Sequence, residues 1–190
     1  MTLPRLLCLA GKAGVGKDTL ADYLVREHGY VKYRFADPLK KLLNDRFGWT
    51  ADDWADREWK EKPQRHCGSR NTAYYPFEYF SPRSWAQWLG TEVGRELGGK
   101  DVWVDAMWRS YSAKDSPNPM VVADARFDNE AASFWARGGD VLHIERPGAQ
   151  AVLAHSSEAG ISEEFWSASV VNDCPMDEFL KRAVAALAKC

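Results

Sequence analysis

The sequence predicts an α/β fold in which a five-stranded parallel sheet is covered by helices on both faces. Short apolar runs of strand length alternate along the chain with segments in which apolar residues recur at helical spacing. The first strand and helix are joined by a glycine-rich turn. At 190 residues, 45% of them hydrophobic, the chain has the usual size of one domain and enough apolar residues for a substantial core.

The N-terminal part contains two strand and helix pairs in succession. Residues 6–10 form an apolar run that ends in glycines, and residues 17–28 have helical spacing. Residues 31–35 alternate like a second strand. Asp37 and the proline after it then offer an N-cap and a first turn for the next helix.

The middle of the chain differs in composition and predicts a helical insertion at about 38–117. Residues 48–82 are polar, aromatic and interrupted by prolines, so we expect irregular structure there. Helical spacing returns at 83–97 and at 102–108. Most of the nine tryptophans lie within the insertion.

Beyond the insertion, the alternation of strand and helix resumes. Three more strands are expected at 120–123, 141–144 and 169–171, with helices at about 129–137 and from Pro175 to the last turn. The predicted domain core therefore comprises residues 1–37, 118–146 and 168–190.

The bulk properties exclude several classes of protein. A formal net charge of −2 provides no overall basic field of the kind that holds a protein on nucleic acid. The apolar run at 6–10 is too short for a signal peptide or a membrane span, so we expect a cytoplasmic protein. The four cysteines are scattered without a CxxC pair, which implies neither a disulfide framework nor a zinc site.

The segment GKAGVGKDT at 11–19 lies between an apolar strand and an amphipathic helix, where a phosphate-binding loop occurs. Glycines let the backbone direct N–H groups at phosphate oxygens, and the helix N-terminus adds positive potential. A glycine turn serves packing alone in other proteins, but the lysine at the right spacing favours a P-loop. The predicted ATP contacts are Gly11, Ala13, Gly14, Val15, Gly16, Lys17, Asp18 and Thr19.

The position after Lys17 departs from the usual P-loop. A serine or threonine hydroxyl normally contacts Mg²⁺ there. Here the position is Asp18, with Thr19 one place later. Either Thr19 contacts the ion, or Mg²⁺ is held mainly through water and nucleotide.

The run VVADAR provides a second candidate pair. Asp124 follows a buried strand at the sheet edge where a P-loop lies, and a carboxylate there can orient magnesium-bound water. Arg126 can neutralise charge on the phosphoryl group in transfer. A helix-capping aspartate and a surface arginine are the alternative. We predict that Lys17, Asp124 and Arg126 are catalytic, and that Thr19 and Asp124 contact Mg²⁺ through water.

Basic and aromatic residues of the insertion are candidates for binding the phosphoryl acceptor, because arginines bind phosphate and aromatic rings stack on bases. Alternatively, the tryptophans form only the small core of the insertion. Asp37 is either an acceptor contact or an ordinary N-cap. The candidates are Asp37, Lys40, Arg70, Arg83, Trp88 and Arg95.

A polar stretch at about 147–167, which includes His155 and Glu158, has the composition of a lid that closes over ATP. Closure excludes water, which competes with the acceptor. His143 lies in a predicted strand, and we expect it to be packed there and not to be catalytic.

Taken in order, several segments resemble the deoxynucleoside monophosphate kinases of tailed bacteriophages. They are GKAGVGKDT, FADPLK, RSWAQWLGTEVGREL, VVADARFDNEA, IERPG, HSSE and VVND. The resemblance covers nearly the whole chain. FADPLK, WLGTE and DARFDNEA are together more specific than GKDT alone.

The resemblance implies phosphorylation of deoxynucleoside monophosphates with ATP and Mg²⁺, for phage DNA precursor synthesis, on a P-loop kinase fold. It also places Gln87 near the acceptor, Arg146 toward ATP from the base of the lid, and Asn172 near the adenine. Such a reaction needs no covalent intermediate, because the acceptor oxygen is already anionic at neutral pH.

Three alternatives keep the P-loop. A kinase of another small acceptor, such as dephospho-coenzyme A or a sugar acid, would share the sheet. A GTP-driven switch would carry an NKxD motif, but the nearest string, VVNDC, lacks the lysine. A nucleic-acid ATPase would need a basic face. We therefore expect small-molecule partners, no nucleic acid and no membrane, while tryptophans exposed on the insertion leave a homodimer open.

Overall fold

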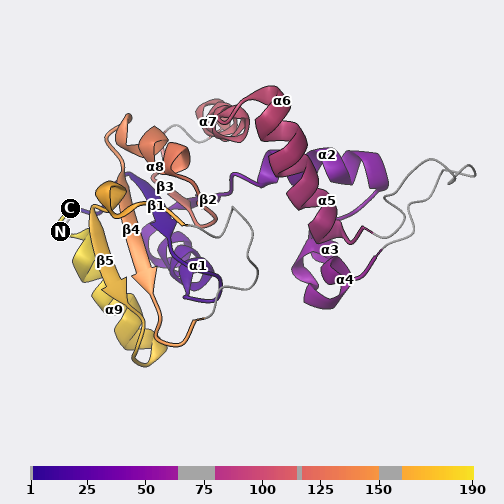
Figure 1. Cartoon of the computed structure of the whole chain (residues 1–190). Coiled ribbons are helices and arrows are strands. Elements are labelled where there is room, and N and C mark those ends of the chain that lie inside the picture. Colours follow the sequence, from indigo (N-terminus) through magenta and orange to yellow (C-terminus); the bar gives the residue numbers. More distant parts are fainter. Residues whose placement is uncertain (1, 64–79, 115–116, 150–159) are drawn as a thin grey trace, which may run out of the picture. The chain divides into compact units, whose positions relative to one another are not determined.

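The computed structural model describes residues 2–63, 80–114, 117–149 and 160–190. The chain divides into two compact units, drawn in Figure 1. Unit 1 comprises Met1–Phe35 and Val104–Cys190, and unit 2 comprises Ala36–Trp103. No helix of the described residues is long and apolar enough to cross a membrane.

Unit 1 contains a five-stranded parallel sheet, which confirms the predicted fold class. The strands are β1 (Leu6–Ala10), β2 (Val31–Tyr33), β3 (Met120–Val122), β4 (Asp140–Glu145) and β5 (Ala168–Val171). Their order is β2-β3-β1-β4-β5, and every neighbouring pair is parallel. Leu7 of β1 pairs with Val121 on one side and Asp140 on the other. The first strand therefore lies in the middle of the sheet.

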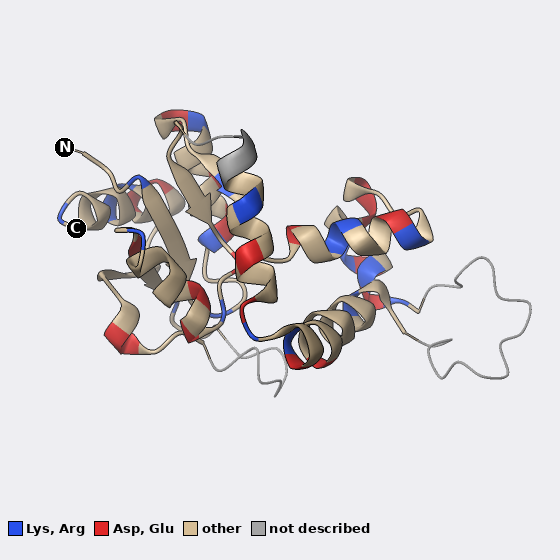
Figure 2. Cartoon of the chain, turned by 90° about the horizontal axis from the view of Figure 1, so that it is seen from above, with Lys and Arg blue, Asp and Glu red and all other residues tan. Residues whose placement is uncertain are grey.

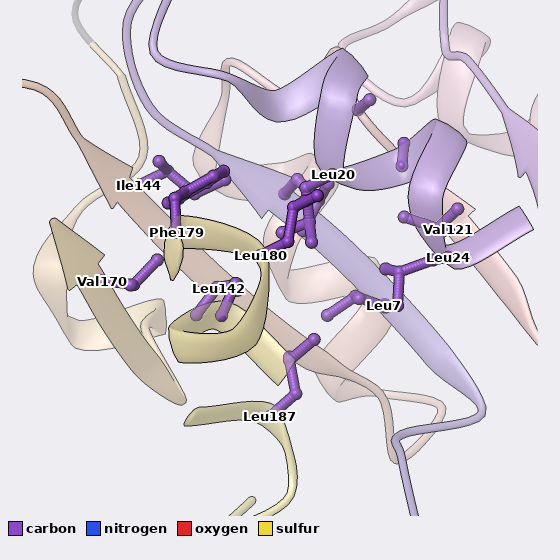
Figure 3. Packing of buried hydrophobic residues seen from close by; sticks show 14 of the residues in the cluster. Leu7, Leu20, Leu24, Val121, Leu142, Ile144, Val170, Phe179, Leu180 and Leu187 are labelled. Atoms are coloured by element: carbon purple, nitrogen blue, oxygen red, sulfur yellow. The ribbon is translucent and has the colours of Figure 1, made fainter. Parts of the chain in front are cut away.

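Helices bury both faces of this sheet, so the central strands are apolar without alternation. On one face, α1 (Lys17–His28) and α9 (Met176–Leu187) pack against the sheet through a cluster that includes Leu20, Leu24 and Phe179 (Figure 3). On the other face, α7 (Val102–Lys114) and α8 (Asp128–Trp135) contribute Met107 and Phe134 to a second cluster. A short 3₁₀ helix, Glu163–Phe165, precedes β5.

Unit 2 is helical over its described residues. It contains α2 (Asp37–Phe47), α3 (Ala51–Ala55), α4 (Arg57–Glu61), α5 (Pro82–Trp88), a π-helical segment (Leu89–Arg95), α6 (Glu96–Gly98) and the first residues of α7. Aromatic rings pack at its centre, where Trp49 contacts Phe47, Trp54 and Trp59 with centroids 4.7 to 5.5 Å apart.

The prediction of irregular structure across 48–82 is wrong at α3 and α4. Each helix has five residues, too few for a periodic pattern to emerge. Their starts are instead fixed by side-chain caps: Thr50 Oγ1 accepts from the Asp53 N–H, and Asp56 accepts from the N–H groups of Glu58 and Trp59.

Candidate functional site

The glycine loop at 11–16 connects the end of β1 to the start of α1. Gly11, Gly14 and Gly16 have φ angles of +130°, +77° and +109°. A Cβ on Gly11 would lie 2.2 Å from the Ile144 carbonyl oxygen, so no side chain fits where the loop crosses β4. Gly16 is the N-cap of α1 and provides no capping side chain. A helix start of this kind directs its first N–H groups at a bound anion.

Two cations hold the carbonyl side of this loop. Lys17 Nζ donates to the Gly11 oxygen at 2.5 Å and to the Lys12 oxygen at 2.7 Å. Arg146, which follows β4, donates from Nη1 to the Gly14 oxygen at 3.3 Å. The predicted lysine and the arginine implied by the resemblance therefore both lie at the loop.

Asn172 anchors the loop from the next strand along the sheet. It follows β5 directly, is 6% exposed, and donates from Nδ2 to the Val15 oxygen at 2.8 Å. Its own backbone N–H donates to the Glu145 oxygen at 2.7 Å. The resemblance implied a place near the adenine, and this hydrogen bond to the loop was not predicted from the sequence.

A cavity of about 370 Å³ opens beside the loop within unit 1. Lys12 and Val15 of the loop, Glu145 and Arg146 at the end of β4, and Val171 at the end of β5 contribute to its wall. Its volume is within the range of small-ligand sites. It lies at the carboxyl ends of parallel strands, where ligands of open α/β sheets bind.

His143 also lines this cavity. Its ring stacks on Trp166 with centroids 3.6 Å apart and planes 9° apart, and Nδ1 is buried without a hydrogen-bond partner among the described residues. Burial lowers the pKa of His143, partly opposed by the carboxylates of Glu145 and Glu163, while Lys17 lowers it further. The packed imidazole is therefore neutral near pH 7.

The carboxylate of Asp18 lies toward β2. It forms ion pairs with Lys32 at 2.8 Å and Arg34 at 2.9 Å. Burial disfavours the charged form, but the hydrogen bonds from Lys32 and Arg34 outweigh it and lower the pKa of Asp18. The neighbouring Thr19 is exposed.

Asp124 and Arg126 lie on the turn between β3 and α8. Asp124 Oδ1 accepts the Phe35 N–H at 2.9 Å, which joins the ends of β3 and β2. The alternative that Asp124 caps a helix is wrong, because α8 begins four residues later at Asp128. Arg126 is exposed. Its exposure fits both the predicted contact with the phosphoryl group and the alternative of an ordinary surface arginine.

Glu130 fixes this turn and was missed in the sequence. It is 3% exposed, and its Oε2 accepts from the N–H groups of Arg126 at 2.7 Å and Phe127 at 3.2 Å. A glutamate in the first turn of a helix commonly reaches back to the N-cap backbone, and that signal was present in DARFDNE. Glu130 and Asp124 also add to the effect of burial, which raises the pKa of Cys8.

The described acceptor candidates all belong to unit 2. The alternative that Asp37 is an N-cap is wrong: Ala36 is the N-cap of α2, and Asp37 lies in the first turn. Lys40 Nζ lies 5.3 Å from the centre of the Trp54 ring. Trp88 packs on Trp85 with centroids 5.6 Å apart.

The other acceptor candidates lie on the helix that follows Phe80. Arg83 forms an ion pair with Glu61, and Arg95 Nη1 donates to the Lys100 oxygen at 3.2 Å. Gln87 lies on the same helix and is partly buried. Arg70, together with His155 and Glu158 of the expected lid, lies outside the described residues.

Several charges of the described residues form local ion pairs, for example Lys41 with Asp45 and Arg182 with Asp173. Figure 2 shows Lys and Arg interspersed with Asp and Glu along the helices. Among the same residues, no group of three or more His, Cys, Asp or Glu could hold a metal ion.

Comparison with known proteins identifies relatives along nearly the whole chain. A family model described as deoxynucleotide monophosphate kinase matches residues 5–63 and 69–183. A protein of Acanthamoeba polyphaga mimivirus that has this activity in its name is 29% identical over 195 residues, which cover 96% of this chain and 95% of that protein. The deoxynucleotide monophosphate kinase of Enterobacteria phage T4 is 24% identical over 94% of this chain and 96% of its own.

Among solved structures, dephospho-CoA kinase from Campylobacter jejuni has a similar fold. The TM-score is 0.52 at 10% identity, and the match covers 97% of this chain and 96% of that chain. At this identity the likeness supports the fold of the chain and carries no information about the acceptor.

Proposed function

The chain belongs to the deoxynucleotide monophosphate kinase family, and from this premise we propose that it transfers the terminal phosphoryl group of ATP to a deoxynucleoside monophosphate. The products are ADP and the deoxynucleoside diphosphate. The observation that carries the proposal is the glycine loop, which places Lys17 at the carboxyl edge of a parallel sheet beside a cavity in the same unit.

For the donor, we propose that the loop and the start of α1 bind the ATP phosphates, with Lys17 turned from the loop carbonyls to the β- and γ-phosphates. The cavity next to Val15 and Val171 takes the nucleoside part. Arg146 contacts the nucleotide from its place at the loop, and Asn172 keeps the loop in the shape that binds it.

Magnesium fits the oxygen-rich surroundings of this loop. Mg²⁺ in kinases keeps several waters and binds substrate phosphates plus one or two protein oxygens, so a dedicated cluster of ligands is not required. Thr19 and Asp124 are the proposed contacts through water, since Asp18 is engaged by Lys32 and Arg34. When bound, the ion neutralises charge on the β- and γ-phosphates.

In the proposed reaction, a phosphate oxygen of the acceptor attacks the γ-phosphorus of ATP. The bond from that phosphorus to the β–γ bridging oxygen breaks, and ADP leaves with the electron pair. Lys17 and Arg126 neutralise the charge that spreads over the transferred group. Positioning and charge therefore account for the rate, and no side chain needs to act as a base.

For the acceptor, we propose that unit 2 provides the binding residues. Arg83 and Arg95 bind its phosphate, because planar guanidinium groups match phosphate oxygens in pairs. Asp37, Lys40, Gln87 and Trp88 complete the set.

The experiment is an ADP-release assay with ATP and Mg²⁺ against each deoxynucleoside and ribonucleoside monophosphate, with dephospho-coenzyme A as a further acceptor. We expect ADP release that depends on at least one deoxynucleoside monophosphate. Release with dephospho-coenzyme A alone, or no release from protein shown to bind ATP, would contradict the proposal.

A further inference from the structure

The helices α5 and α6 belong to one continuous helical stretch (Figure 1), and the segment between them is π-helical. The segment Leu89–Arg95 departs from α-helical hydrogen bonding, and the N–H of Glu96 donates to the Thr91 oxygen five residues back. Such a turn holds about one residue more than an α-helix of the same length, and it is less stable than α-helix unless its surroundings support it. The chain must therefore provide contacts that hold this turn in place.

Trp103 provides such contacts through the two glycines of the turn. A Cβ on Gly94 would lie 2.5 Å from the Trp103 ring, so the absence of a side chain there makes room for the indole. Trp103 Nε1 donates to the Gly90 oxygen at 2.8 Å. The indole thus fills the space at one glycine and pairs with the carbonyl of the other.

The extra residue changes the direction in which the end of the helix presents its side chains. In an uninterrupted α-helix, position 95 would lie roughly 120° around the axis from position 83. One inserted residue reduces that angle to roughly 20°, while Gln87 lies roughly 40° from Arg83. The π-helical turn therefore puts Arg95 on the same helix face as Arg83 and Gln87.

We propose that Trp103 is a positioning residue for acceptor binding: by holding the π-helical turn, it keeps Arg95 in line with Arg83 and Gln87. The inference rests on the proposed function, since it takes these three residues as the acceptor face of unit 2. Trp103 acts through Arg95 and does not itself touch the acceptor. Trp103, the π-helical segment and the three acceptor residues all belong to unit 2.

The test is Trp103→Phe, which keeps an aromatic ring beside Gly94 but removes the N–H that pairs with the Gly90 oxygen. We expect the KM for the acceptor to rise on the order of tenfold, the effect of one lost, partly buried hydrogen bond, while the KM for ATP stays unchanged. The matched control is Trp135→Phe, since Trp135 is 46% exposed on α8 and contacts Phe165 only at its edge. This control should leave both constants unchanged.

A double variant separates positioning from general destabilisation. In an Arg95→Ala background, Trp103→Phe should raise the acceptor KM no further, because its effect passes through Arg95. If Trp103→Phe does not fold, Gly94→Ala serves as the test in its place. The added Cβ would displace the Trp103 indole, while Trp103 itself and its N–H donor remain.

Equal rises in both KM values, no rise in folded Trp103→Phe, or full additivity with Arg95→Ala would each overturn the inference. A wild-type protein that fails to phosphorylate any deoxynucleoside monophosphate would instead overturn the proposed function. The two failures are distinguished by the wild-type assay alone.

Discussion

At the scale of single residues, the charges around the glycine loop have different tasks. Lys17 donates hydrogen bonds to the carbonyl oxygens of Gly11 and Lys12. Asp18 instead forms ion pairs with Lys32 of β2 and with Arg34, which directly follows that strand. At the position after Lys17, where the usual P-loop has a hydroxyl, this chain therefore has a carboxylate that joins α1 to the sheet by an ion pair.

Lys17→Ala should lower kcat by roughly two orders of magnitude or more, because it removes one full charge from the phosphoryl group in transfer. Steady-state turnover with saturating ATP and acceptor measures this loss. Lys41→Ala is the matched control: Lys41 is 75% exposed and paired with Asp45 on α2, and its loss should leave turnover unchanged. Near-normal turnover in Lys17→Ala would refute the assignment of the loop.

The neutral, stacked His143 predicts a pH dependence of stability. Its pKa is lower in the folded protein than the ordinary 6.5, so the unfolded chain binds the proton more readily. The contribution of neutral His143 to the free energy of unfolding is therefore complete above the pKa of the unfolded chain. It is lost as the pH falls from that value through the pKa of the folded protein. His143→Phe keeps a ring on Trp166 and should flatten the fall in melting temperature between about pH 7 and pH 5. Parallel curves for the two proteins would contradict this assignment.

At the scale of elements, hydrophobic periodicity was sufficient to predict the strands and several helices, but it did not reveal the short helices. The five strands and the helices α1 and α8 were predicted within one or two residues, because burial on one or two faces imposes a visible pattern. Helix α7 was predicted at 102–108 but extends to Lys114. Helices α3 and α4 depend on the N-caps Thr50 and Asp56, and caps produce no hydrophobic periodicity in the sequence. The π-helical turn was likewise invisible, since it depends on Trp103, eight or more residues further on.

In the site, the sequence located the loop but not its supports. GKAGVGKDT carries its own spacing, whereas Asn172 lies 157 residues from the carbonyl it contacts. Glu130 is closer, and its place in DARFDNE is that of a capping glutamate, but the sequence does not show that its carboxylate also accepts the Arg126 N–H. Long-range polar contacts of this kind emerge only from the folded sheet.

Asn172→Ala should weaken ATP binding because it leaves the buried Val15 carbonyl without its donor. The expected loss of folding free energy is about 1–3 kcal/mol, accompanied by a rise in the dissociation constant for ATP. Calorimetric titration and thermal unfolding measure the two effects. As a control, Asn44→Ala removes the acceptor of the Trp54 indole in unit 2, and it should lower stability without changing ATP affinity. An unchanged ATP affinity in folded Asn172→Ala would contradict a role for Asn172 in shaping the loop.

At the scale of the whole molecule, unit 2 is one continuous segment of the chain, with both of its ends joined to unit 1. The insertion was expected at about 38–117, but unit 2 ends at Trp103. The difference is α7, whose residues Val104, Met107, Trp108 and Tyr111 are buried in the second core cluster of unit 1. Its two tryptophans, Trp103 and Trp108, suggested that α7 belongs to the insertion, whereas the buried residues from Val104 onward pack in unit 1.

Phosphoryl transfer by the whole molecule is tested by following the label from ATP that carries a radioactive γ-phosphate, with the preferred deoxynucleoside monophosphate as acceptor and Mg²⁺ present. We expect wild-type protein to move the label to the deoxynucleoside diphosphate, and Lys17→Ala to form roughly a hundredfold less of it or lower still. Label found only in inorganic phosphate, or equal amounts of labelled diphosphate from both proteins, would contradict the proposed transfer.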